Sequence, residues 1–251
     1  MKKFFTLCAA LFMGFTAAHA DEGMWLLKLM KQQHLEDSLR KAGLQLPATA
    51  LYSETAPSLR DCIGIFGGGC TGEVVSPEGL ILTNHHCGFS YVHEMSGIGH
   101  DYMKDGYFAH NRSEELRTPA SLTFTFVKRI TDVTAQVNAE AVKKHADEYT
   151  RQSIGFLEPI AQKMLKKSEF AKLKGMTARI VPYFGGNQFY IFFEQKYQDI
   201  RLVANPPYNI GQFGGNSDNW MWPRHNADFC MFRIYADKNG QPAPYSKDNV
   251  P

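Results

Sequence analysis

The sequence predicts a mainly β fold with inserted helices, and a β-barrel is the arrangement that we expect. Short runs of β-branched and aromatic residues are separated by turn-forming residues, which is typical of antiparallel strands. Segments of helix composition are inserted between these runs, a pattern that favours a barrel over a parallel α/β sheet. Aromatic residues make up 13% of the chain, which suits a packed β-rich core.

Two hairpins are the clearest elements of this pattern. The first joins residues 73–75 to residues 80–83 through the turn Ser76-Pro77-Glu78-Gly79, and the second joins 176–182 to 188–193 through Gly185-Gly186-Asn187. Further strands are expected within residues 121–133 and over 228–236. Helices are expected over 24–42, with Gly43 as the C-cap, and within 137–174, with interruptions at Gly155 and Pro159 and a stop at Gly175.

The first twenty residues are typical of a secretory signal peptide. Lys2 and Lys3 precede the apolar stretch 4–18, and Ala18-His19-Ala20 is a cleavage site of the A-x-A type. An uncleaved anchor helix is the alternative, but the apolar run is short. We therefore expect residues 21–251 to be exported to the periplasm or cell surface, with no membrane span after cleavage. No later segment reaches the ~18 apolar residues that a span requires.

Charge and cysteine content exclude several classes of protein. The net charge of +2 falls to zero without Lys2 and Lys3, so nothing indicates binding to nucleic acid. In an exported chain the remaining cysteines suggest disulfides, with three possible pairings. No C-x-x-C pair is present, and His93-Glu94 lacks the second histidine of a zinc motif, so no metal site is expected. Cys8 lies in the signal-like segment, and the four remaining cysteines are Cys62, Cys70, Cys87 and Cys230.

The glycine-rich stretch 67–72 matches the G-x-G-x-x-G pattern of dinucleotide sites. That fingerprint requires a helix to begin at its third glycine. Here the strand residues 73–75 and a turn follow instead. We therefore expect the glycines to permit tight strand packing, and no organic cofactor is predicted.

The stretch from Cys70 to Cys87 is the most informative part of the chain. A strand, a turn, a second strand and then His-Cys is the order in which chymotrypsin-like proteases present their catalytic histidine. This resemblance implies that His86 is a general base and that Cys70 pairs with Cys87. The hairpin also brings the two cysteines toward each other. His85 would point to the opposite face if the segment is extended.

A catalytic histidine needs a carboxylate to orient it, and two downstream aspartates are candidates. Asp228 stands at the start of an apolar strand, where a buried carboxylate requires a partner. Asp218 lies in a polar loop typical of solvated turns. The sequence therefore favours Asp228.

The whole arrangement resembles the bacterial periplasmic serine dipeptidyl-peptidases of types 7 and 11, across nearly all of residues 21–251. The matching stretches are Asp21-Glu22-Gly23-Met24-Trp25, residues 66–72, Thr83-Asn84-His85-His86-Cys87, and residues 216–229 with their Asn-Trp-Met-Trp-Pro-Arg-His run. The resemblance implies the first barrel of a two-barrel chymotrypsin-like domain, capped by a large helical domain. It also implies release of dipeptides from the free N-terminus of oligopeptides, and a homodimer for the full-length enzyme.

Carried over position by position, the family's catalytic histidine and aspartate fall on His86 and Asp228, and its Asn-Trp pair for the substrate's α-ammonium group falls on Asn219 and Trp220. The family's nucleophilic serine lies in a Gly-Asn-Ser-Gly setting that this chain does not reach, so the chain is expected to be an N-terminal part of a longer enzyme. Ser217 imitates that setting, but Asp218 replaces the glycine. The alternatives are a complete endopeptidase that uses Ser217 and a noncatalytic peptide-binding module.

Cys62 and Cys230 stand at positions where we expect small residues in members of the family. Both cysteines flank strand segments of the sequence. They are expected either to form a second disulfide or to remain as two buried thiols.

Overall fold

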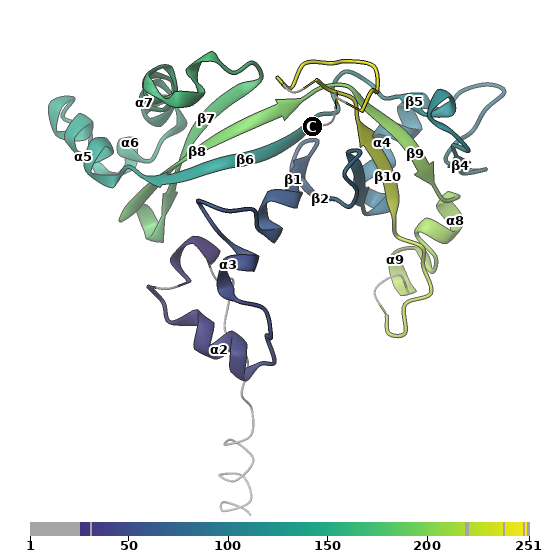
Figure 1. Cartoon of the computed structure of the whole chain (residues 1–251), viewed down its shortest axis with the longest axis horizontal. Coiled ribbons are helices and arrows are strands. Elements are labelled where there is room, and N and C mark those ends of the chain that lie inside the picture. Colours follow the sequence, from purple (N-terminus) through teal and green to yellow (C-terminus); the bar gives the residue numbers. More distant parts are fainter. Residues whose placement is uncertain (1–25, 31, 219–220, 238, 248, 250–251) are drawn as a thin grey trace, which may run out of the picture. The chain divides into compact units, whose positions relative to one another are not determined.

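A computed structural model of the chain describes residues 26–30, 32–218, 221–237, 239–247 and 249 (Figure 1). The chain divides into two compact units, and the boundary along the sequence lies between Ala56 and Pro57. The expected signal peptide, residues 1–20, lies outside the described residues. Within those ranges, no helix combines the length and the apolar character needed to cross a membrane.

In its described part, the first unit contains three short helical segments around a small core of Met30, Leu35 and Ala48. The single helix predicted over 24–42 is wrong in the described part, because His34 takes a left-handed backbone conformation with a φ of 52°. The predicted end at Gly43 is confirmed: its φ is 105°, a conformation that glycine adopts without strain. The segments are η1 (Leu27–Leu29), α2 (Leu35–Lys41) and α3 (Ala48–Leu51).

The second unit contains one antiparallel sheet in the order β4-β9-β10-β3-β2-β1-β6-β8-β7, with β5 also paired to β9 (Figure 1). The mainly β class with inserted helices is therefore confirmed. The described strands form an open sheet, and the expected closed barrel is not seen. The strands are β1 (Ile63–Phe66), β2 (Cys70–Val74), β3 (Leu80–Thr83), β4 (Tyr107–Phe108), β5 (Leu116–Arg117), β6 (Phe124–Asp132), β7 (Met176–Tyr183), β8 (Gln188–Tyr197), β9 (Ile200–Asn205) and β10 (Cys230–Ile234).

Both predicted hairpins are present in this sheet. In the first, Glu73 of β2 pairs with Leu82 of β3, and the N–H of Val75 donates to the carbonyl of Leu80 at 2.8 Å. In the second, β7 pairs over its whole length with residues 188–195 of β8. Strand β9 was not among the expected strands.

Strands that lie far apart in the sheet contribute side chains to the same hydrophobic core. Phe66 of β1, Ile81 of β3, Phe124 of β6, Leu202 of β9 and Phe232 of β10 are buried in the same cluster. A sheet whose distant strands fill one core must curve around it, because a flat sheet would separate these side chains. This core lies beneath the candidate site described below.

The glycine-rich stretch lies between two strands, as the sequence predicted. Gly67 and Gly69 have positive φ values in the turn from β1 to β2. A Cβ atom at Gly72 would lie 3.0 Å from both Ile81 and Phe124, so this position needs glycine for packing. Strand β2 and not a helix follows this turn, so the stretch lacks the helix N-terminus that binds the phosphates of a dinucleotide.

Helices α5 and α7 pack on one end of the sheet, where they cover β7 and β8 through a second apolar core. Helix α7 runs through Gly155 and Pro159, where interruptions were predicted, because Phe156 and Ile160 anchor it in that core. The helices are η2 (Leu59–Cys62), α4 (His85–Met95), η3 (Arg112–Glu114), α5 (Thr134–Lys143), α6 (Glu148–Arg151), α7 (Ile154–Lys167), η4 (Glu169–Lys172), η5 (Phe184–Gly186), α8 (Tyr208–Gly211) and α9 (Gly215–Asp218).

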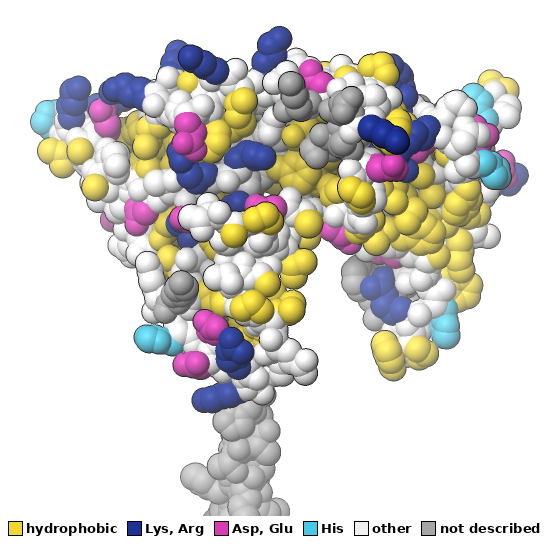
Figure 2. Space-filling model, in the orientation of Figure 1, with side chains coloured by type: hydrophobic (Ala, Val, Ile, Leu, Met, Phe, Trp, Pro, Cys, Tyr) yellow, Lys and Arg dark blue, Asp and Glu magenta, His cyan; other side chains and the backbone are white. Residues whose placement is uncertain are grey.

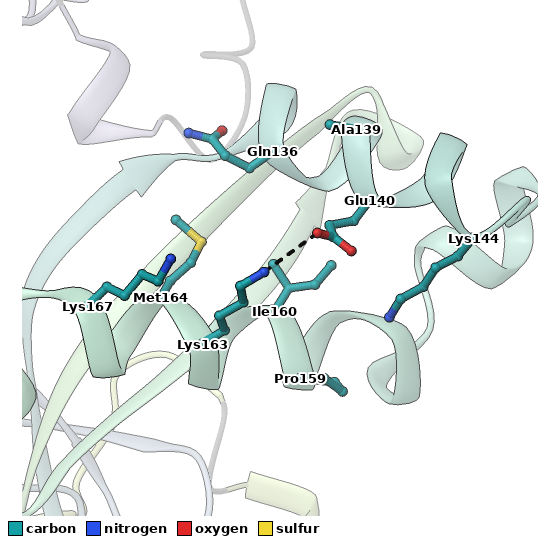
Figure 3. Close-up of a pocket in the computed structure, with 9 residues that line it drawn as sticks. All are labelled: Gln136, Ala139, Glu140, Lys144, Pro159, Ile160, Lys163, Met164 and Lys167. Atoms are coloured by element: carbon teal, nitrogen blue, oxygen red, sulfur yellow. Dashed lines mark ion pairs between the residues drawn. The ribbon is translucent and has the colours of Figure 1, made fainter.

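A hollow of about 440 Å³ lies between α5 and α7. Lys144, Lys163 and Lys167 extend along its apolar floor, and Lys163 pairs with Glu140 at 3.8 Å (Figure 3). All of its lining residues lie between positions 136 and 167. This hollow therefore belongs to the helical end of the sheet.

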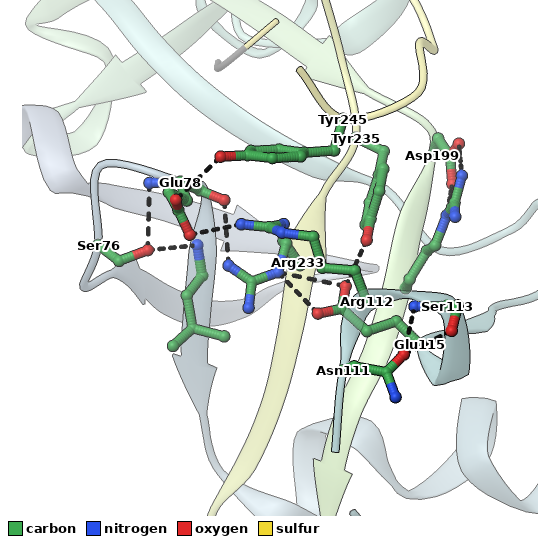
Figure 4. Close-up of polar contacts among 12 residues, drawn as sticks. Ser76, Glu78, Asn111, Arg112, Ser113, Glu115, Asp199, Arg233, Tyr235 and Tyr245 are labelled. Carbon is green, nitrogen blue, oxygen red and sulfur yellow. Dashed lines mark hydrogen bonds and ion pairs between the residues drawn. The ribbon is translucent and has the colours of Figure 1, made fainter. Parts of the chain in front are cut away.

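A polar cluster ties β10 to the turns beside it (Figure 4). The side chain of Glu115, only 3% exposed, accepts from Arg233 Nε at 2.9 Å and from the Tyr235 hydroxyl at 2.8 Å. Glu78 pairs with Arg112 and accepts from the Tyr245 hydroxyl at 3.0 Å. The cluster joins the β2–β3 turn to the segment that follows β10.

A disulfide joins Cys70, the first residue of β2, to Cys87 in the first turn of α4, with 5.9 Å between their Cα atoms. The pairing predicted from the sequence is confirmed. Cys62 and Cys230 do not form the second disulfide, and the alternative of two buried thiols is wrong for Cys62, which is exposed, while Cys230 is buried. Burial raises the pKa of the Cys230 thiol, so this side chain stays protonated.

Glu115→Ala should lower the free energy of unfolding by about 3–5 kcal/mol, because it leaves the mostly buried Arg233 without its carboxylate. The matched control is Glu169→Ala, which removes the exposed partner of Arg129. That variant should cost less than about 1 kcal/mol. Chemical denaturation of the protein measures both changes, and equal effects would contradict the structural role of Glu115.

Reduction of the Cys70–Cys87 bond should lower the free energy of unfolding by roughly 2–4 kcal/mol, because the unfolded chain then regains the freedom that the closed loop removes. Thermal unfolding with and without dithiothreitol measures the change. The control is the double variant Cys70→Ala, Cys87→Ala, whose melting temperature should not respond to the reductant. An equal fall in melting temperature in both proteins would show that the reductant does not act through the Cys70–Cys87 bond.

Candidate active site

His86 lies at the start of α4, directly after β3. Strand β3 ends at Thr83, and Asn84 keeps an extended backbone before the helix begins at His85. The side chain of His86 is 59% exposed, whereas that of His85 is buried. Because the two histidines are consecutive residues of a helix, their side chains point in directions about 100° apart, and not to opposite faces as in an extended strand.

Asp228 and His86 are hydrogen-bonded to each other. Nδ1 of His86 lies 3.1 Å from Oδ2 and 3.2 Å from Oδ1 of Asp228, and the backbone N–H of His86 also donates to Oδ1 at 3.2 Å. A carboxylate can only accept, so Nδ1 carries the proton in this pair and Nε2 is left as an acceptor. An imidazole held in this way can take a proton from a hydroxyl placed at Nε2.

The Asp228 carboxylate is held by further groups. The side-chain amide of Asn84 donates to Oδ2 and to the backbone carbonyl of Asp228, each at 3.2 Å. The Arg224 guanidinium lies 3.9 Å from Oδ2. The carboxylate is 12% exposed and faces the N-terminus of α4, where the helix dipole favours negative charge. Sequence reasoning missed Asn84, although its place just before the helix is a signal for a helix start.

Of the two aspartates considered, the structure brings Asp228 to His86. Asp218 is exposed and ends the short helix α9, as the polar sequence around it indicated. Ser217 also lies in α9 with an exposed side chain. The two predicted substrate-binding residues, Asn219 and Trp220, lie outside the described residues.

His85 packs in the interior next to His86. A Cβ atom at Gly211 would lie only 2.6 Å from its ring, so the glycine permits close contact between α8 and α4. Burial lowers the pKa of His85, opposed by the charge of Asp228 and by a hydrogen bond with the Pro206 backbone. His85 therefore serves the packing of this region as a neutral side chain.

The contact between α4 and β10 is also very close. A Cβ atom at Gly88 would lie 2.8 Å from Sγ of Cys230 and 3.2 Å from the ring of Phe232. Sγ of Cys230 in turn donates to the carbonyl of Ala204 at 3.4 Å. The disulfide at Cys87 holds the other side of the same helical turn. The backbone that follows His86 is thus held in place at two consecutive residues.

Within the described part of the chain, no group of His, Cys, Asp and Glu residues is arranged to hold a metal ion. The residues around His86 are instead suited to proton transfer. They comprise a partly exposed imidazole and a carboxylate that orients it.

Comparison with known proteins identifies relatives of the whole chain. Dipeptidyl-peptidase 7 of Phocaeicola vulgatus is 50% identical over 252 residues, which cover 100% of this chain and 35% of that protein. An Asp/Glu-specific dipeptidyl-peptidase of Porphyromonas endodontalis is 43% identical over 256 residues, covering 100% of this chain and 34% of that protein.

Solved structures agree with these relatives. The crystal structure of Porphyromonas endodontalis DPP11 in complex with the dipeptide Arg-Glu is similar with a TM-score of 0.81 and 42% identity, over 92% of this chain and 33% of that one. The chain thus spans about a third of the length of the relatives it matches. The model of the family described as Peptidase S46 matches residues 20–251. The chain therefore belongs to the peptidase S46 family.

Proposed function

We propose that this chain is the N-terminal part of a serine-type dipeptidyl aminopeptidase, an enzyme that releases dipeptides from the free N-terminus of oligopeptides. The observation that carries the proposal is the hydrogen-bonded pair of His86 and Asp228 at the start of α4. Membership in the peptidase S46 family and the names of the relatives support the same activity.

In the proposed mechanism, Nε2 of His86 takes the proton from the nucleophilic serine as the serine attacks the scissile carbonyl. Asp228 holds the ring in the tautomer with the proton on Nδ1 and stabilises the imidazolium that forms. The imidazolium then gives its proton to the leaving amine, and water hydrolyses the acyl-enzyme by the same route. The serine itself is expected in a Gly-Asn-Ser-Gly segment of the longer protein, outside this chain.

We infer that Asn219 and Trp220 bind the α-ammonium group of the substrate. An amide oxygen accepts a hydrogen bond from an ammonium group, and an indole face packs favourably beside it. Both residues belong to the connection between α8 and β10, which leads directly to Asp228. The N–H of Ala227 donates to the carbonyl of Ile210 at 2.8 Å. The end of this connection, next to Asp228, therefore lies beside α8, where the connection begins.

We further infer that the curved sheet around Phe66, Phe124 and Phe232 is the first barrel of a two-barrel chymotrypsin-like domain. The shared core and the position of His86 after a β-hairpin support this arrangement. Export to the periplasm or cell surface is also proposed. The signal-like residues 1–20 and the Cys70–Cys87 disulfide support it, because such bonds persist in oxidising compartments.

His86→Ala and Asp228→Asn in the full-length protein should each lower kcat by about 10³-fold or more, because the first removes the base and the second removes its orienting charge. Release of a fluorescent amine from dipeptidyl substrates measures the loss. His110→Ala is the matched control, since this exposed histidine pairs with Glu114 elsewhere on the surface. Activity of the His86 variant close to that of the control would refute the assignment, and a wild-type protein without hydrolysis would favour the peptide-binding module.

Acetylation of the substrate's N-terminus should abolish cleavage by the full-length protein. The acetyl group removes the positive charge that the amine site is proposed to bind. Mass spectrometry of the products from matched free and acetylated hexapeptides checks this expectation. Equal turnover of the two peptides would instead indicate an endopeptidase.

A further inference from the structure

Asn84 occupies the N-cap of α4, the position just before the helix, but its side chain does not cap the helix. An N-cap side chain usually accepts a hydrogen bond from the backbone N–H of the second or third helical residue. The side chain of Asn84 makes no such bond. The N–H of His86, the second residue of α4, donates instead to Oδ1 of Asp228 at 3.2 Å. A carboxylate 144 residues from Asn84 thus takes the place of the cap.

The side-chain amide of Asn84 is directed at two acceptors of Asp228. Nδ2 lies 3.2 Å from Oδ2 and 3.2 Å from the backbone carbonyl oxygen of Asp228. Both partners can only accept hydrogen bonds, so the amide must present its NH₂ group to them and not its oxygen. The two bonds together fix the carboxylate relative to its own backbone, because they hold both ends of the Asp228 side chain.

Each carboxylate oxygen of Asp228 has a donor besides the imidazole. Oδ1 accepts from the backbone N–H of His86, and Oδ2 accepts from Asn84. Nδ1 of His86 lies 3.2 Å and 3.1 Å from these two oxygens. Without Asn84 the carboxylate could turn about the donor at Oδ1, and the ring of His86 would turn with it. The His86 side chain is largely exposed, so packing alone does not fix the ring.

The segment between α9 and β10, which carries Asp228, is exposed toward its tip. Figure 2 shows hydrophobic side chains at this tip, and Met221 and Trp222 in the segment are 60% and 90% exposed. Arg224, in the same segment, lies 3.9 Å from Oδ2 of Asp228, a distance at which a guanidinium contributes charge and not a fixed direction. The orientation of the carboxylate therefore depends on contacts close to Asp228 itself.

We infer that Asn84 is a positioning residue of the proposed peptidase, which acts through Asp228. Its amide holds the carboxylate in the orientation that keeps the proton on Nδ1 of His86 and directs Nε2 toward the serine. Asn84 takes no proton itself. The inference rests on the proposed function, because it concerns the base of that reaction. It predicts an effect on kcat and not on KM.

A helix cap and a hydrogen-bond donor require different side chains at position 84. Asp caps a helix as well as Asn does, but an ionised carboxylate has no donor and would repel the carboxylate of Asp228. Gln keeps the amide donor and is not among the preferred N-cap residues. The two substitutions therefore separate the two roles, because each keeps one property and removes the other.

The test measures dipeptide release by the full-length protein at about pH 8, where carboxyl groups are ionised. Asn84→Asp and Asn84→Ala should each lower kcat by about 10- to 100-fold and leave KM within about twofold, because a misplaced base slows the chemical step without weakening binding. Asn84→Gln should retain a higher kcat than either variant, since it keeps the donor.

Two further measurements control for indirect effects. In a protein that carries Asp228→Ala, the change Asn84→Ala should alter kcat by less than about twofold, because the group that Asn84 positions is then missing. Asn111→Ala is the matched control: Asn111 is exposed and caps η3 by accepting from the N–H of Ser113 at 3.0 Å. This control should leave kcat and KM unchanged. Melting temperatures of all variants exclude unfolding as the cause.

The outcomes separate this inference from the proposed function. A higher kcat in Asn84→Asp than in Asn84→Gln would identify Asn84 as a helix cap and refute the positioning role. A rise in KM with kcat unchanged would assign Asn84 to substrate binding and likewise refute it. An equal loss from Asn84→Ala with and without the Asp228 carboxylate would show that Asn84 does not act through it. Each of these results leaves the proposed function intact, whereas a wild-type protein without dipeptide release would refute that function and the positioning role with it.

Discussion

The carboxylate of Asp228 is the group on which the local structure depends. It accepts hydrogen bonds from the backbone and the ring of His86 and from the side chain of Asn84. These bonds connect the segment before β10 to the start of α4, two parts of the chain that are 142 residues apart. One side chain thus fixes where the helix begins and how the imidazole is oriented, because both depend on the same two oxygens.

Local patterns predicted the parts of the site that local chemistry determines. The hairpin β2–β3 follows from its turn residues, and the choice of Asp228 over Asp218 follows from the apolar strand after it. Helix α4 could not be predicted in the same way. Its residues include Gly88, the aromatic side chains Phe89 and Tyr91, and the β-branched Val92, which lower helix propensity. The disulfide, the Asp228 carboxylate and the burial of Val92 overcome that preference through contacts distant in sequence.

The sheet shows the same limit at a larger scale. Each hairpin has a turn signal, but the pairing of β10 with β3 and of β1 with β6 joins strands far apart in sequence. Nothing in a short window specifies such partners, so the order of strands and the curvature of the sheet were beyond local reasoning. Strand β9 was missed for a related reason: its place beside β10 becomes evident only in the folded unit.

The close contact between Gly88 and Cys230 has a consequence for sequence change in this protein. Helix α4 approaches β10 only as far as the volumes at these two positions allow. A larger residue at either position would move the helix and, with it, lengthen the hydrogen bond between His86 and Asp228. The geometry of proton transfer therefore depends on two side chains that take no part in it. Substitutions at positions 88 and 230 are accordingly expected to be correlated, with any increase in volume at one offset by the other.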